Sequence, residues 1–192
     1  MAAIGMRAAR TGLSTKPFAD TTPEPVPFTP FHFGPGLLGK GLAARWYSWT
    51  AFVASNVVID CESLYYLQRD EYPIHRKLHT FVGAAIVGIA TACVLLGVRH
   101  LLPRLRARLD ERAPTVRAEG SVVGIVVGAM VGALSHPLLD GIMHPDIEPF
   151  QPWTAANPLY GVVGLGALHL GCLAAGVLGA VLVAIWRKRE RQ

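Results

Sequence analysis

The sequence predicts an all-α integral membrane protein, a helical bundle with three transmembrane helices plus a helical hairpin or fourth span near residues 37–59. Of its 192 residues, 52% are hydrophobic and only 16% are charged, whereas a soluble domain is about a quarter charged. The surplus apolar surface is therefore expected to face lipid. Long apolar runs, and the His, Asp and Glu side chains that gather at their ends, are the other two observations behind this prediction.

Residues 1–26 contain Thr, Pro, Ala and scattered charge without an apolar block. This composition is typical neither of a signal peptide nor of a span, so we expect a disordered leader. A single membrane-embedded helical domain is expected at 27–186, and a basic cytoplasmic tail at 187–192.

The first apolar region, residues 37–59, is interrupted by Lys40 and Arg45. It forms either a poor first span or a helical hairpin that turns near residues 40–45. A straight span of about 20 residues would place His32 and Asp60 on opposite faces of the bilayer, whereas a hairpin would return both to one side. The hairpin is favoured if His32 is a ligand; otherwise four spans with the amino terminus inside form the simpler topology.

Three further runs, at 81–98, 122–139 and 159–186, are long enough to cross a hydrocarbon core of about 30 Å. The second is interrupted only by His136 and the third only by His169. Their many Gly and Ala residues are expected to allow close helix approach. A hydrogen bond to a neighbouring helix is expected for His169, because no ligand partner follows it one turn later.

The net charge of +5 is concentrated in the loop at 99–117 and in the tail at 187–192. Short Arg-rich and Lys-rich segments remain in the cytoplasm, so both are placed there. The connection at 140–157 has no Lys or Arg and is placed outside. This pattern explains the basic charge without nucleic acid, which is not expected as a partner.

Ionisable side chains beside a hydrocarbon core are costly and indicate a functional site. His75 and His79 are four residues apart, so in a helix their rings would project from one face and could close on one ion. His136, Asp140 and His144 repeat the same step. Pro137 is expected to kink that helix and Pro145 to help end it.

Imidazole and carboxylate ligands together suit zinc, with manganese or iron as other candidates. We therefore predict one or two divalent ions. The predicted ligands of the catalytic ion are His75, His79, His136 and Asp140. Asp60 or Glu62 is expected to bridge ions or to act as the general base, and His144 with His32 to bind a second ion.

Four motifs occur in order along residues 27–160: Pro-Phe-Thr-Pro-Phe-His at 27–32, Asp60-x-Glu62, the segment 75–80, and Ser-His-Pro-Leu-Leu-Asp at 135–140. Together they resemble a family of bacterial membrane-bound metal-dependent hydrolases. That family is distantly similar to the zinc-dependent phospholipases C and related single-strand nucleases. The resemblance implies an all-helical fold with clustered zinc ions.

Residue by residue, the resemblance implies that His136 and Asp140 are the H-x-x-x-D ligand pair and that Asp60 is the bridging carboxylate. His75 or His79 would match the histidine that follows, and His32 the early histidine. The phospholipases also have a later H-x-x-x-E motif, which has no counterpart after His144. The resemblance therefore implies one or two ions instead of three.

The function predicted from the sequence is hydrolysis of a phosphoester, carried by a lipid or a lipid-linked molecule, at the outer surface of the bacterial cytoplasmic (inner) membrane. The alternative is a non-enzymatic membrane protein that binds metal for structure or transport. Transporters place ligands near the midplane, whereas these lie at the edge. A haem-binding bundle would need two facing histidines inside the spans, and only His169 qualifies.

Overall fold

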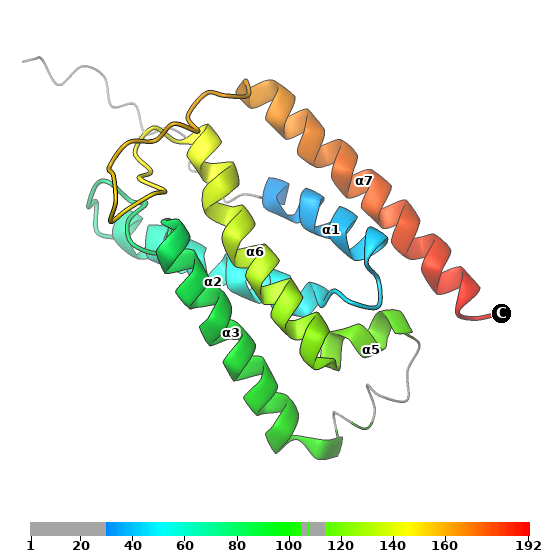
Figure 1. The fold of residues 1–192 in the computed structure, drawn as a ribbon. Coiled ribbons are helices and arrows are strands. Elements are labelled where there is room, and N and C mark those ends of the chain that lie inside the picture. Colours follow the sequence, from blue (N-terminus) through cyan, green and yellow to red (C-terminus); the bar gives the residue numbers. More distant parts are fainter. Residues whose placement is uncertain (1–29, 105–106, 108–113) are drawn as a thin grey trace, which may run out of the picture.

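The computed structural model describes residues 30–104, 107 and 114–192. The predicted leader at 1–26 and part of the basic loop at 99–117 lie outside the described residues. Within them the fold is all-helical, as predicted, and Figure 1 shows the arrangement of the helices. The elements are η1 (Pro30–His32), α1 (Phe33–Leu42), α2 (Trp49–Leu67), α3 (Phe81–Leu101), α5 (Pro114–Gly120), α6 (Val122–Met143) and α7 (Leu165–Arg189).

Three helices, α3, α6 and α7, are long and apolar enough to cross a membrane. Each of the first two begins at a hydroxyl cap: Thr80 Oγ1 accepts the N–H of Gly83, and Ser121 Oγ accepts the N–H of Gly124. Such caps satisfy donors that the first helical turn leaves free. The three predicted transmembrane helices are thus present.

The last span begins later than predicted, at Leu165 instead of residue 159. The residues before it are used to close the end of α6. Asn157 Nδ2 donates to the carbonyls of Gly141 and His144, and the N–H of Gly161 donates to Ile142. Gly161 has a φ of 71°, which a helix does not accommodate.

The region at 37–59 forms the hairpin and not a straight span. α1 and α2 are joined by a turn at residues 43–48, which Lys40 Nζ closes by donating to the carbonyl of Tyr47 at 2.8 Å. The hairpin returns the chain to its starting end, because His32 before α1 and Asp60 on α2 both contact His136.

Helix α6 is the centre of the packing, in contact with both α2 and α3, whereas α7 lies alongside α1 (Figure 1). Glycine permits these close approaches, as predicted. A Cβ on Gly132 of α6 would lie 2.5 Å from the carbonyl oxygen of Phe52, and one on Gly179 of α7 would lie 2.4 Å from Leu37. Close backbone contact is how helices associate where lipid surrounds them.

A buried ion pair lies at the end of the hairpin opposite to His32 and Asp60. Lys40 is 6% exposed, and its Nζ lies 2.7 Å from Glu119 Oε1. The same carboxylate accepts the N–H groups of Trp49 and Thr50 and the hydroxyl of Ser48, so it also caps α2. This pair was not predicted from the sequence, although a lysine within an apolar region was the signal for it.

The first testable prediction concerns the pH dependence that Glu119 gives to stability. Burial alone would raise the pKa of Glu119, but hydrogen bonds from Lys40, Thr50 and Ser48 together hold that pKa below its ordinary value. A carboxylate with a lowered folded-state pKa stabilises the fold above its unfolded-state pKa, and this contribution is lost as the pH falls through the folded-state pKa.

We therefore expect Glu119→Gln to lower the free energy of unfolding by about 3 kcal/mol at pH 7, because it removes the carboxylate that is paired with the buried Lys40. The variant should also lose less stability than the wild type on acidification from pH 6 to pH 4. Denaturant unfolding in detergent measures both effects. Glu71→Gln, at a surface pair with Arg76, is the matched control. Equal acid sensitivity of wild type and Glu119→Gln would contradict the prediction.

Candidate metal centre

One end of the bundle brings together imidazole and carboxylate groups from segments far apart in the sequence. They come from η1, the second half of α2, the loop at 68–80, the end of α6 and the loop that follows it. Every residue predicted as a metal ligand lies in this cluster. The members predicted from sequence are His32, Asp60, His75, His79, His136, Asp140 and His144.

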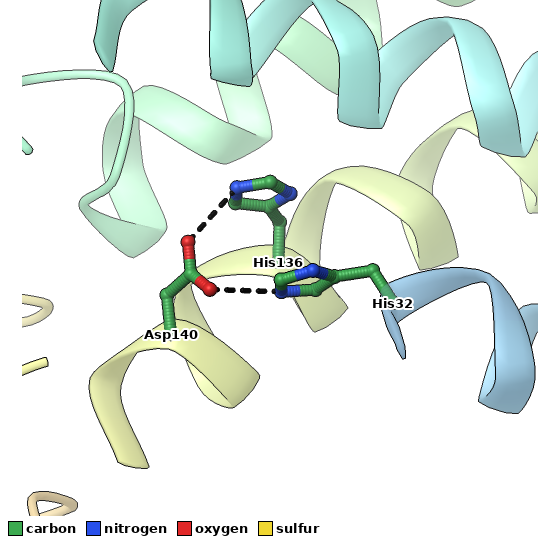
Figure 2. A group of neighbouring side chains, drawn as sticks. All are labelled: His32, His136 and Asp140. Carbon is green, nitrogen blue, oxygen red and sulfur yellow. Dashed lines mark ion pairs between the residues drawn. The ribbon is translucent and has the colours of Figure 1, made fainter. Parts of the chain in front are cut away.

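The carboxylate of Asp140 lies in the middle of the cluster and is 2% exposed. Its Oδ1 lies 3.0 Å from His32 Nε2, and its Oδ2 lies 3.1 Å from His136 Nε2 (Figure 2). His79 Nε2 is 3.7 Å from the same Oδ2. Three imidazoles therefore converge on a single buried carboxylate.

The ring of His136 is held in one orientation by Asn56. Asn56 Nδ2 donates to the carbonyl of Phe52, which leaves its Oδ1 to accept from His136 Nδ1 at 3.0 Å. The proton of a neutral His136 is thereby assigned to Nδ1. Its Nε2 lone pair then points toward Asp140 and toward Asp60 Oδ1 at 3.3 Å.

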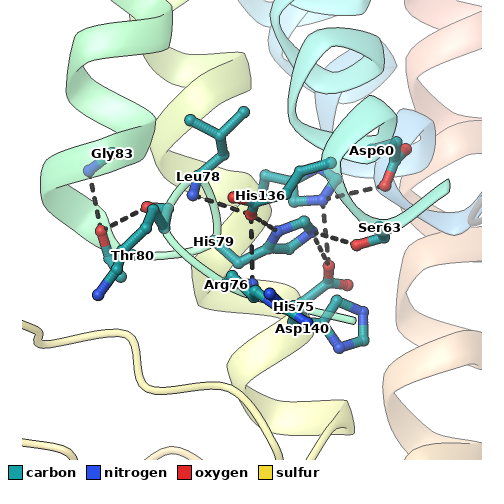
Figure 3. A network of polar contacts seen from close by, with 12 residues as sticks. Asp60, Ser63, His75, Arg76, Leu78, His79, Thr80, Gly83, His136 and Asp140 are labelled. Carbon is teal, nitrogen blue, oxygen red and sulfur yellow. Dashed lines mark hydrogen bonds and ion pairs between the residues drawn. The ribbon is translucent and has the colours of Figure 1, made fainter. Parts of the chain in front are cut away.

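His79 has the same tautomer for a similar reason. Figure 3 shows its ring beside Ser63, His136 and Asp140. Its Nδ1 donates to Glu62 Oε2 at 3.1 Å, so its Nε2 lone pair faces the cluster. Burial lowers the pKa of His79, although the hydrogen bond to Glu62 opposes this effect. The neutral form, which can bind a metal, is therefore favoured.

Glu62 does not lie where a bridging group or general base would be expected. Its Oε2 accepts His79 Nδ1 and the backbone N–H groups of Arg76, at 3.2 Å, and of Leu78, at 2.9 Å. A carboxylate bound to the outer nitrogen of a ligand histidine fixes the orientation of that ring. The geometry thus assigns Glu62 to orienting His79 and leaves Asp60 as the candidate base.

His75 and His79 do not lie on a helix, so the predicted helical spacing is wrong. Both are in the loop at 68–80, between the end of α2 and the start of α3. In this loop Glu62 accepts the backbone N–H groups of Arg76 and Leu78, which a helix would use itself. The rings still meet, with centroids 4.8 Å apart. Donor atoms of His75, His79 and Asp140 lie within 4.8 Å of one another, as the shared site requires.

His144 does not continue the helical step of His136 and Asp140, because α6 ends at Met143 and His144 is its C-cap. Pro137, expected to kink the helix, lies inside it. The ring of His144 packs on His75 with centroids 4.6 Å apart. His32, its predicted partner, stacks on His136 at 4.4 Å.

Asp146 belongs to the cluster but was missed by sequence reasoning. Its Oδ2 lies 3.0 Å from His75 Nδ1. Burial would raise the pKa of Asp146, but the hydrogen bond to His75 and the charge of that ring lower it overall. Burial lowers the pKa of His144. The signal in the sequence was the His-Pro-Asp at 144–146, which extends the ligand run by one carboxylate.

Two other histidines lie outside the cluster. His169 was expected to form a hydrogen bond to a neighbouring helix, but its ring stacks on Phe31 at 4.1 Å. Among the described residues its buried Nε2 has no hydrogen-bond partner. His100 is exposed near the end of α3.

The buried nitrogen and oxygen atoms of the cluster are better suited to binding a divalent metal ion than to forming hydrogen bonds with one another. Within the described part of the chain, no hydrogen-bond partner is found for His32 Nε2, His136 Nε2 or Asp140 Oδ1, although these atoms lie close together. Buried polar groups without partners are costly. Imidazole nitrogens and carboxylate oxygens that converge in this way are what metal ligands present.

Residues 26–192 match a protein family described as a domain of unknown function, DUF4184. No curated protein and no solved structure matches the chain. The family match covers every residue of the cluster and carries no assigned activity.

The second testable prediction follows from the contact between Glu62 and His79. Glu62→Gln should weaken Zn²⁺ binding about 10- to 100-fold, because the ring of His79 is no longer held by a carboxylate. Titration of detergent-purified protein against a competing chelator measures this affinity. Glu71→Gln removes a nearby carboxylate that contacts only the Arg76 side chain in the described network, and should bind zinc like the wild type. Unchanged affinity in Glu62→Gln would refute the orienting role.

Proposed function

The chain belongs to the DUF4184 family, and from its site we propose that it is a membrane-bound metal-dependent hydrolase acting on a phosphoester. The observation that carries this proposal is the convergence of His32, His79 and His136 on buried Asp140, where no hydrogen-bond partner is found among the described residues for His32 Nε2, His136 Nε2 or Asp140 Oδ1. The resemblance to bacterial membrane-bound hydrolases, and more distantly to zinc phospholipases, agrees with it.

The ion proposed for this site is zinc or a similar divalent cation, held by His32, His79, His136 and Asp140. Such an ion would polarise the phosphoryl oxygen and make a water molecule more acidic. Asn56 and Glu62 keep the ligand rings in their binding orientation. The ring stack between His32 and His136 restricts the remaining freedom of His32.

Asp60 is the proposed general base. Its side chain is 22% exposed, more than that of buried Asp140, and its Oδ1 lies 3.3 Å from His136 Nε2. It can therefore reach a water at the open side of the cluster. In the proposed reaction the water oxygen bonds to phosphorus while its proton passes to Asp60. The ester P–O bond breaks, and the leaving oxygen takes the proton from Asp60 to become an alcohol, which returns Asp60 to its carboxylate form.

A lipid or lipid-linked substrate is proposed because the cluster lies at the ends of the spanning helices α3 and α6. Exposed aromatic side chains are found at the same end, namely Tyr65, Tyr72, Trp153 and Tyr160. Tyr and Trp favour the headgroup layer of a bilayer. A phosphoester in that layer would meet the cluster without leaving the membrane.

A second candidate activity rests on Ser63. Its hydroxyl lies 3.2 Å from His79 Nε2, and His79 Nδ1 in turn contacts Glu62. A serine, a base and an orienting carboxylate in this order are the parts of a covalent hydrolase. The metal proposal is preferred because Ser63 is only 7% exposed, which leaves a substrate little access to its hydroxyl.

The third testable prediction is metal-dependent hydrolysis by the purified protein. Phosphatidic acid and phosphatidylglycerol in detergent micelles test a phosphomonoester and a phosphodiester. Activity should disappear on chelation and return with Zn²⁺, and Asp60→Asn should lower kcat by about 10²- to 10⁴-fold. His100→Gln, far from the cluster, should behave like the wild type.

The variant Ser63→Ala separates the candidate activities. If activity survives chelation but not Ser63→Ala, the serine mechanism replaces the metal proposal. If zinc binds but neither lipid is hydrolysed, the protein is better described by the non-enzymatic alternative, metal binding for structure or transport.

The fourth prediction concerns location. We propose the bacterial inner membrane, with the cluster facing outward and the basic tail in the cytoplasm, because segments rich in Arg and Lys are retained inside. With the native Cys61, Cys93 and Cys172 replaced by Ala, Ala155→Cys should react with an impermeant thiol reagent in intact cells. Gln192→Cys should react only after lysis; both positions are exposed. The opposite labelling would place the cluster in the cytoplasm.

A further inference from the structure

We propose that His75, His144 and Asp146 form a second metal site beside the first. This inference rests on the proposed metal-dependent function and extends it to a centre with two ions. It replaces the pairing of His144 with His32 that the sequence indicated.

The donor atoms of His75, His144 and Asp146 lie within 4.8 Å of one another. His75 Nδ1 is 3.0 Å from Asp146 Oδ2, and the His144 ring lies 4.6 Å from that of His75. A hydrogen bond between His75 and Asp146 explains why these two side chains lie together, but it does not explain the position of His144. A cation accounts for all of them, since two imidazoles and a carboxylate are a common zinc ligand set.

The backbone holds these residues in place without metal. The N–H of His144 donates to the carbonyl of Asp140 at 2.8 Å, and its own carbonyl accepts Asn157 Nδ2 at 3.1 Å. Next to His75, the N–H of Arg76 donates to Glu62. Ligands fixed in this way lose little conformational entropy on binding an ion.

The charge of the surroundings also favours a cation. The ion pairs of Asp60, Asp140 and Asp146 are made with histidine rings. The basic side chains of the neighbouring loop contact other groups. Arg76 contacts Glu71 and the Tyr66 ring, and Lys77 Nζ donates to Gln151. Among the described residues the ion pairs of these carboxylates are with imidazole rings, and a bound cation would add to that positive charge.

The second site adjoins the first, because His75 also lies within 4.8 Å of ligand atoms on His79 and Asp140. It is also the more open of the two. The Asp146 side chain is 35% exposed, against 3% for Asp140. Three protein ligands and an open side leave a position for an oxygen of the substrate. Paired ions of this kind clamp the attacking and leaving oxygens at phosphorus, which favours a phosphoester over a carboxylic ester.

The experiment counts zinc ions by elemental analysis of full-length, detergent-purified protein after dialysis against buffered Zn²⁺. Wild type and the control His100→Gln should hold about two ions, and His144→Gln and Asp146→Asn about one. If His144→Gln does not fold, Asp146→Asn still tests the proposal. The Asp146 side chain is partly exposed, so its replacement disturbs the fold less. Size-exclusion chromatography and circular dichroism show which variants are folded.

A wild-type count of about one that His144→Gln and Asp146→Asn leave unchanged would overturn the second site and leave the proposed hydrolase intact. A folded wild type that binds no zinc would overturn both. A count that falls by about one in His144→Gln or Asp146→Asn but not in His100→Gln supports the second site.

Discussion

The burial of the Asp140 carboxylate is the constraint on which the arrangement of this protein depends. Asp140 is 2% exposed near the end of a helix long enough to cross a membrane. A lone carboxylate in such surroundings is strongly disfavoured, and it must be paired, neutralised or bound to a cation. Imidazoles from η1, α6 and the loop before α3 surround it. The carboxylate and the imidazoles, each of which would be destabilising if buried alone, are thus gathered in one cluster.

The rest of the fold brings those groups together. Gly132 lets α6 approach α2 closely enough for Asn56 and Asp60 to reach His136. The hairpin of α1 and α2 carries His32 back to the same end. At its other end, the Lys40–Glu119 pair fixes the turn and caps α2. The two buried polar networks therefore sit at opposite ends of one hairpin and hold its register between them.

Within the cluster, the side chains divide into those that face the centre and those that hold them. Asn56 and Glu62 contact the outer nitrogens of His136 and His79 and determine which nitrogen is free. Orientation by such outer partners raises ligand basicity and tunes metal affinity. Asp60 and Asp146 are the more exposed carboxylates of the cluster, so a substrate of the proposed hydrolase would approach from their side.

The sequence by itself determined the spans, the hairpin as one of two alternatives, and most members of the cluster. Apolar run length is a local property, and ionisable residues beside lipid are rare enough to be recognised without a fold. The sequence did not determine how the ligands pair. Spacing placed His75 and His79 on a helix, but they lie in a loop whose backbone N–H groups bind Glu62 of α2. Spacing also placed His144 in line with His136 and Asp140, but α6 ends before it. Asp146, Glu119 and the orienting role of Glu62 depend on contacts across the bundle, and only the tertiary structure brings those groups together.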